Sequence, residues 1–149
     1  MRRRCHKRPA PVRSPVLNTL VDRFRRFDRL VEVGIGHQTQ LAGALAESAE
    51  VTATDIVTRE VPPGVTFVQD DLTDPDPRVY TEVDFVYAVN IPLELHRPFA
   101  DLLATFELEG AFTTFGTEGP AVPATPEPAG GATLYWITQD EAVRATRRD

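Results

Sequence analysis

Cysteine, lysine and histidine are scarce in this chain of 149 residues, and each scarcity excludes something. A single cysteine, Cys5, cannot form an intrachain disulfide, which excludes a disulfide-stapled secreted scaffold and predicts a cytoplasmic protein. With one cysteine and three histidines, the chain has few zinc ligands, so we expect no metal site. The longest apolar run, Phe85 to Leu93, is interrupted by Asn90 and Pro92. It is far shorter than the roughly 20 residues that span a bilayer, so we expect no membrane partner.

Charge is divided unevenly between the first residues and the rest. Residues 1–15 carry six basic and no acidic side chains, which is typical of a disordered basic arm. Residues 16–149 hold all 22 acidic and ten basic side chains, a net charge of −12, and are expected to form one domain. This acidity argues against nucleic acid as a partner, except weakly through the arm. Lys7 is the only lysine, and the composition fits either a salt-rich (halophilic) cytoplasm or a GC-rich coding sequence.

Hydrophobic periodicity predicts alternating helices and strands, typical of an α/β domain around a mostly parallel sheet. Strands are predicted at Arg29–Val33, Glu50–Thr54, Val65–Gln69, Val83–Val89, Gly110–Phe115 and Ala132–Thr138. Helices are predicted at Val16–Phe27, after the first strand, at Leu93–Glu107, and at Asp140–Arg148 with Asp140 as N-cap. The segment Gly116–Gly131 holds four prolines and four glycines, which predicts a long surface loop.

The strongest local motif is VEVGIG, between the first strand and the next helix. Gly34 and Gly36 allow a tight turn and let a ligand approach the backbone N–H groups of a helix start. A dinucleotide fingerprint would need a third glycine where the chain has Thr39. The segment resembles instead the first motif of class I S-adenosylmethionine-dependent methyltransferases, in which an acid, here Glu32, precedes the glycine turn by two positions. The third glycine of that family falls at Gln38.

Acidic residues also end the second and third predicted strands. Asp55 follows Gly34 by 21 residues, a place where an acid accepts hydrogen bonds from ribose hydroxyls in NAD-binding folds and methyltransferases alike. In FVQDDL, Asp71 resembles the methyltransferase acid that contacts the adenine amine, with Leu72 beside the ring. The tandem of Asp70 and Asp71 leaves that assignment open between them.

The turn after the fourth strand resembles the [DN]PPY motif of amine methyltransferases, with Ile91 in place of the first proline and Leu93 in place of the aromatic residue. Asn90 is therefore the candidate substrate-binding residue, although such residues also simply close turns. Catalytic residues stay unknown, because methyl transfer mainly demands in-line positioning. We expect His37 to be a solvated residue at the helix start, and Trp136 to serve in packing.

Together, VEVGIGHQTQLAGAL, VTATDI, FVQDDLTDP and DFVYAVNIPLELHRP resemble a small archaeal uncharacterised protein family, 0146, over about residues 16–140. That family is similar to truncated class I methyltransferases. The resemblance implies a Rossmann-like domain with helices on both faces, strand order 3-2-1-4-5 and the last strand antiparallel beside the fifth. It also implies S-adenosylmethionine, or its demethylated product, as the ligand.

Two functions from different classes follow. The first is a small methyltransferase with an unknown acceptor, whose acceptor site is completed by a partner chain or a homodimer. The second is a non-catalytic scaffold that binds a nucleoside ligand or a protein partner. An NAD-binding module is disfavoured, because the carboxylate of Glu32 would face a pyrophosphate.

Overall fold

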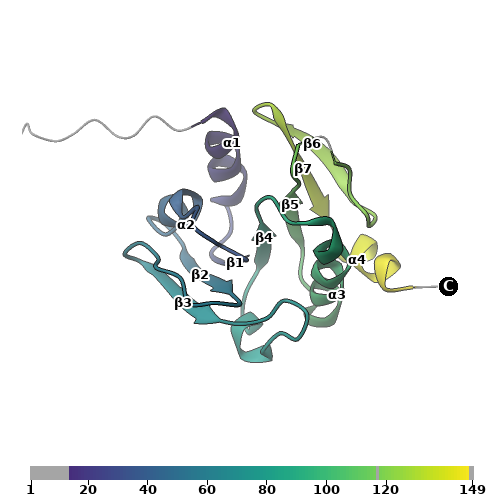
Figure 1. The fold of residues 1–149 in the computed structure, drawn as a ribbon, viewed down its shortest axis with the longest axis horizontal. Helices are drawn as coiled ribbons and strands as arrows, with labels where there is room; N and C mark the ends of the chain where they lie inside the picture. Colours follow the sequence, from purple (N-terminus) through teal and green to yellow (C-terminus); the bar gives the residue numbers. More distant parts are fainter. Residues whose placement is uncertain (1–13, 117, 148–149) are drawn as a thin grey trace, which may run out of the picture.

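A seven-stranded sheet organises the chain in a computed structural model that describes residues 14–116 and 118–147. The spatial order is β3-β2-β1-β4-β5-β7-β6 (Figure 1). The first five strands are parallel, and β7 runs antiparallel to both β5 and β6. The strands are β1 (Arg29–Val33), β2 (Glu50–Asp55), β3 (Val65–Gln69), β4 (Phe85–Ala88), β5 (Gly110–Thr113), β6 (Thr125–Ala129) and β7 (Ala132–Ile137). The mostly parallel sheet and the place of β7 confirm the predicted topology.

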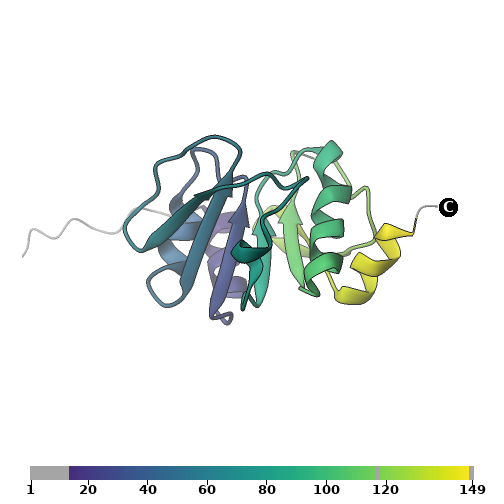
Figure 2. The ribbon, with the colours of Figure 1, turned by 90° about the horizontal axis from the view of Figure 1, so that it is seen from below.

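In the described part of the chain, four helices cover the two faces of the sheet. They are α1 (Pro15–Phe24), α2 (Gln40–Leu45), α3 (His96–Phe106) and α4 (Gln139–Thr146), with short 3-10 turns η1 (Pro77–Tyr80) and η2 (Leu93–Leu95). α1 and α2 pack on one face and α3 and α4 on the other (Figures 1 and 2). None of the described helices is long and apolar enough to cross a membrane.

Strand burial explains why the predicted strands formed. Every residue of β4 and β5 is buried, which matches their apolar sequences, because helices cover both faces of a central parallel strand. On the α1 face, Phe24 contacts Phe85 and Tyr87, with ring centroids 5.0 and 4.9 Å apart. Trp136 meets Phe24 edge-on at 5.9 Å, so its predicted packing role is confirmed.

The first helix begins and ends earlier than predicted. α1 spans Pro15–Phe24 instead of Val16–Phe27, so Pro15 belongs to the helix and not to the predicted arm. Residues 1–13 of the predicted arm lie outside the described residues. The side chain of Ser14 caps α1 by accepting from the backbone N–H of Leu17, and Pro15 occupies the first helical turn, where its missing N–H costs nothing.

The prediction of an unbroken loop over Gly116–Gly131 is wrong, because β6 lies within it. Pro126 and Pro128 made the segment unlike a strand. At a sheet edge, however, a proline is tolerated where its nitrogen faces the open side, because no partner strand there needs an N–H donor. β6 is the outermost strand, paired only with β7. The hairpin that joins β6 to β7 then packs its Gly130 against the first residues of α1.

The predicted cap of the last helix is also wrong. Thr138, not Asp140, is the N-cap of α4, and it forms a reciprocal capping box with Glu141. Asp140 lies in the first turn instead, where its charge favours the helix dipole.

Candidate functional site

A pocket of about 350 Å³ opens at the carboxyl ends of the parallel strands, where β1 lies between β2 and β4. The chain leaves β1 toward β2 on one side and returns through β4 on the other, so the pocket lies at the switch point where such sheets bind ligands. Its wall comes from the ends of β1, β2 and β4 and from the turns after β3 and β4. The lining residues are Val33, Gly34, Thr54, Asp55, Ile56, Asp70, Asp71, Leu72, Ala88, Val89, Asn90, Ile91, Pro92 and Leu95.

The glycine turn forms the floor of this pocket. Gly34 has a φ of +67°, a conformation that L side chains rarely adopt, and a Cβ built there would project into open space. The N–H of Ile35 donates to the carbonyl of Thr54 at 3.0 Å, and the N–H of Gly36 donates to the carboxylate of Asp55 at 2.9 Å. These bonds hold the turn against the end of β2 and leave its upper surface clear.

Asp55 is 8% exposed and lines the pocket with one side of its carboxylate. Oδ2 accepts from Gly36 and lies 3.3 Å from Nε of Arg59, and Oδ1 lies 3.4 Å from the N–H of Val57. A carboxylate offers about four acceptor sites, so this one retains capacity for ligand hydroxyls. Arg59 in turn places Nη1 3.1 Å from Nε2 of His37, which is exposed as predicted but lies in the turn before α2 rather than at the helix start.

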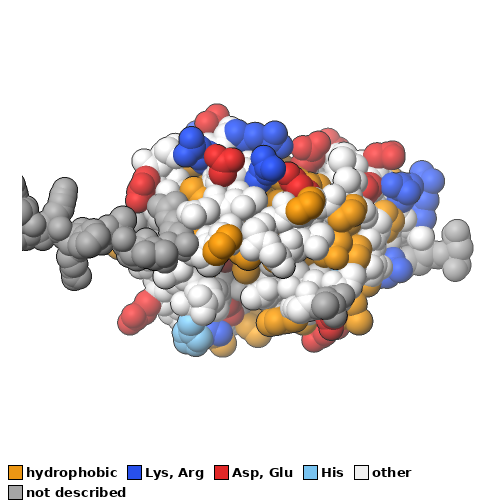
Figure 3. All heavy atoms as spheres, turned by 90° about the horizontal axis from the view of Figure 1, so that it is seen from above, with side chains coloured by type: hydrophobic (Ala, Val, Ile, Leu, Met, Phe, Trp, Pro, Cys, Tyr) orange, Lys and Arg blue, Asp and Glu red, His pale blue; other side chains and the backbone are white. Residues whose placement is uncertain are grey.

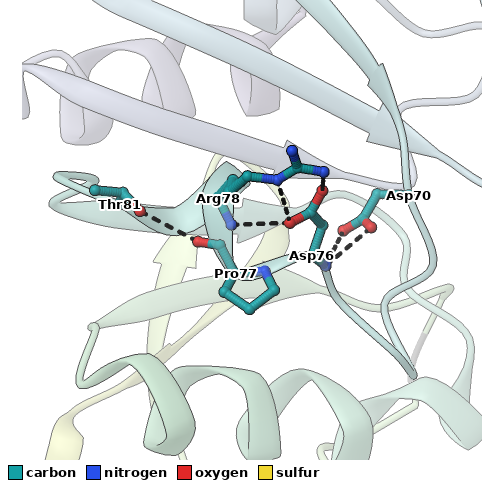
Figure 4. A network of polar contacts seen from close by, with 5 residues as sticks. All are labelled: Asp70, Asp76, Pro77, Arg78 and Thr81. Atoms are coloured by element: carbon teal, nitrogen blue, oxygen red, sulfur yellow. Dashed lines mark hydrogen bonds and ion pairs between the residues drawn. The ribbon is translucent and has the colours of Figure 1, made fainter.

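The two acids after β3 are held in different ways. Asp70 accepts from the N–H of Asp76 through both carboxylate oxygens, at 3.0 and 3.3 Å, and Asp76 pairs with Arg78 (Figure 4). Burial raises the pKa of Asp70 above its ordinary value. Asp71 accepts from the hydroxyl and backbone N–H of Thr73, and these bonds hold its pKa below the ordinary value. Both acids line the pocket, so the adenine contact assigned to Asp71 stays a prediction.

Asn90 lies at the other end of the pocket in a left-handed conformation, with a φ of 54°. Its N–H donates to Oγ1 of Thr113 at 2.8 Å, and the N–H of Ile91 donates to the carbonyl of the same residue at 2.9 Å. The turn after β4 is thereby fixed to the end of β5. The side-chain amide of Asn90 makes no hydrogen bond within residues 14–116 and 118–147.

Glu32 lies in the core rather than on the pocket wall. It is 2% exposed, pairs in register with Tyr87 of β4, and its Oε1 has no hydrogen-bond partner among the described residues. Burial raises its pKa from 4.5 to about 8, an effect that the Tyr87 hydroxyl partly offsets. The carboxyl is therefore protonated at neutral pH, and its predicted contact with a ligand stays a prediction.

The structure thus brings five of the seven predicted site residues to one pocket: Gly34, Asp55, Asp71, Leu72 and Asn90. Gly36 lines a separate polar pocket with His37 and Arg59, and reaches the first pocket through its bond to Asp55. Among the described residues, no three metal-ligating side chains come together.

Sequence reasoning missed Ile56 and Arg59. Ile56 is 66% exposed and lines the pocket directly after Asp55. The signal available in the sequence was the position of Ile56, directly after the acid that ends β2. Arg59, four residues beyond Asp55, could have been identified by its spacing, but the intervening turn hides which way the guanidinium points.

Comparison with known proteins finds relatives of this chain. Residues 17–129 match the model of an uncharacterised protein family, UPF0146. A UPF0146 protein of Halobacterium salinarum is 41% identical over 113 residues, which cover 75% of this chain and 88% of that protein. A second, from Archaeoglobus fulgidus, is 43% identical over 68 residues, 45% of this chain and 52% of that protein.

Two solved structures are similar in fold. A putative ribosomal RNA methyltransferase from Plasmodium falciparum has a TM-score of 0.57 at 9% identity, covering 84% of this chain and 96% of that one. A TehB-like SAM-dependent methyltransferase from Corynebacterium glutamicum has a TM-score of 0.57 at 14% identity, covering 85% and 88%. These likenesses confirm the Rossmann-like, methyltransferase-type fold.

Proposed function

This chain belongs to the UPF0146 family of uncharacterised proteins, and from its pocket we propose that it binds S-adenosylmethionine and transfers the methyl group to an acceptor. One observation carries the proposal: a single pocket joins Asp55, the acids after β3, the open glycine turn and Asn90. The ligand extends over the ends of β2, β1 and β4, with its adenosine beside β2 and its methyl group toward Asn90.

The adenosine half matches the side of the pocket near β2 and β3. Asp55 retains acceptor capacity for a ribose hydroxyl, and Ile56 and Leu72 offer apolar surface to the faces of a base. Covering the exposed Ile56 with a planar ring removes apolar area from water, a favourable change on binding. Asp70 or Asp71 would then accept from the exocyclic amine.

The methionine half matches the glycine turn and the net charge of the pocket. At Gly34 a side chain would project into the open space that the ligand needs, so glycine keeps the floor accessible. When bound, S-adenosylmethionine supplies a methyl group on a positively charged sulfur. The acids at positions 55, 70 and 71 make the surrounding potential negative, which favours this cation over a neutral ligand of the same shape.

Calorimetric titration with S-adenosylmethionine, S-adenosylhomocysteine and NAD tests the proposal, at low and at multimolar salt. We expect the first two to bind and NAD not to bind. In Asp55→Asn, which keeps one oxygen acceptor for the turn, affinity should fall about 10- to 100-fold, since a hydrogen bond to a charged group contributes about 1.5–3 kcal/mol.

A matched control is Asp84→Asn. Asp84 also accepts two backbone N–H groups, those of Asp28 and Arg29 at 3.1 and 2.8 Å, but it lies at the amino ends of the strands. Its replacement should leave affinity unchanged. Equal affinities in Asp55→Asn and the unmodified protein would show that the ribose does not meet Asp55. Binding without methyl transfer to any acceptor would favour the non-catalytic scaffold.

A further inference from the structure

Exposed apolar side chains gather at the edge of the sheet that carries the pocket. Among the residues that the structure describes, five large hydrophobic ones are more than a third exposed, and four of them follow strand ends at this edge: Ile56, Val57, Leu93 and Phe115. The fifth, Val143, lies on α4. Uncovered apolar groups beside a pocket favour the binding of something apolar there.

Leu93 and Phe115 lie in the two segments that meet at Asn90, although neither is among the residues that line the pocket. Leu93, 51% exposed, stands between Pro92 and Leu95, which both line the pocket. Phe115, which is 54% exposed, lies two residues after Thr113, the last residue of β5. Because Thr113 holds the turn at Asn90 through two hydrogen bonds, the end of β5 and the turn after β4 form one continuous rim.

The charges near this edge are mainly acidic. Acidic side chains follow β2, β3 and β4, whereas Arg59, in the turn after β2, is already paired with Asp55. Arg78, after β3, lies with Arg29 and Glu50 at the opposite edge of the sheet. Figure 3 looks onto the α1 side of the molecule, where basic and acidic side chains lie next to one another. A protein binds a polyanion such as RNA through unpaired basic side chains that contact the phosphate groups. The acidic side chains at this edge would instead repel those phosphates.

Resting on the proposed function, we propose that the acceptor is a neutral or cationic small molecule with an apolar body, which Leu93 and Phe115 hold beside Asn90. In the reaction, an electron pair of the acceptor forms a bond to the methyl carbon. The carbon–sulfur bond breaks, and its electrons stay on sulfur as a neutral thioether. A proton displaced from the acceptor leaves to water through the pocket mouth. The amide of Asn90 is available to orient the acceptor atom.

Three naphthalene probes of one shape and different charge test this inference: 1-naphthylmethylamine, 1-naphthalenemethanol and 1-naphthoate. Each is titrated into protein saturated with S-adenosylhomocysteine, and a short single-stranded RNA is titrated in parallel. We expect the amine and the alcohol to bind, and the naphthoate and the RNA to bind at least tenfold more weakly or not at all.

The variants Leu93→Ala and Phe115→Ala should each weaken binding of the amine about tenfold, since each removes apolar contact area. Both side chains are exposed, so folding and affinity for S-adenosylhomocysteine should not change. Val143→Ala is the matched control, because it removes an exposed apolar side chain away from the rim.

The outcomes separate the two proposals. Equal binding of the naphthoate, RNA that displaces the amine, or equal losses in the control would overturn the acceptor inference while leaving the cofactor proposal intact. Failure of S-adenosylhomocysteine to bind would overturn both.

Discussion

Replacing Glu32 with glutamine tests the most unusual electrostatic feature of the core. The carboxyl is 2% exposed, and burial raises its pKa from 4.5 to about 8 in the folded protein. The folded state therefore holds this proton more tightly than the unfolded state does. Between these two pH values the unfolded chain releases the proton and the folded chain keeps it, so the free energy of unfolding decreases as pH rises.

The size of the effect follows from the two pKa values. Each pH unit contributes about 1.4 kcal/mol, so the free energy of unfolding should fall by about 5 kcal/mol between pH 4.5 and 8. That is a large share of the roughly 5–15 kcal/mol that stabilises a typical domain. Glutamine has nearly the same shape and no charge. Glu32→Gln should therefore match the unmodified protein near pH 5 and be more stable by several kcal/mol at pH 8 and above.

Denaturant unfolding at constant salt, followed from pH 5 to 9, measures this difference. The control is Glu47→Gln, an exposed position whose replacement should leave the pH profile unchanged. Parallel profiles for Glu32→Gln and the unmodified protein would refute the reasoning. They would mean that water or a neighbouring group solvates the carboxylate as well in the folded state as in the unfolded chain.

Two further predictions concern the elements that the sequence did not place correctly. In Gly130→Ala, a Cβ would lie 2.4 Å from the carbonyl carbon of Pro15, at a φ of +64°, so the denaturation midpoint should fall clearly. Gly119→Ala, where a Cβ meets nothing within 4 Å, should not change it. Thr138→Ala removes the capping box of α4 and should cost about 1 kcal/mol in unfolding experiments, whereas an equal loss in Asp140→Ala would contradict the assigned cap.

The sequence predicted the strand-glycine-helix unit and the position of the pocket because both depend on short-range patterns. An apolar strand followed by Gly34 and Gly36 has few other ways to turn into a helix. Parallel strands also bring their carboxyl ends to one edge, so residues that each follow a strand, such as Asp55 and Asn90, meet without any further information.

The tertiary structure decided what depends on partners distant in the chain. β6 forms although Pro126 and Pro128 oppose it, because β7 offers an edge at which a missing donor is tolerated. Glu32 faces the α1 side of β1 beside Tyr87, and this burial makes a residue that the motif assigns to the ligand a neutral member of the core.

The sequence by itself therefore determined the class of fold and the edge at which a ligand would bind, since periodicity and turn residues act locally, whereas the order of the parallel strands was implied by the family resemblance. Only the tertiary structure decided that Glu32 is buried away from the pocket that Asp55 and Asp71 line, and that Arg59 pairs with Asp55. These outcomes depend on burial and on distances between segments, and no spacing along the chain specifies either.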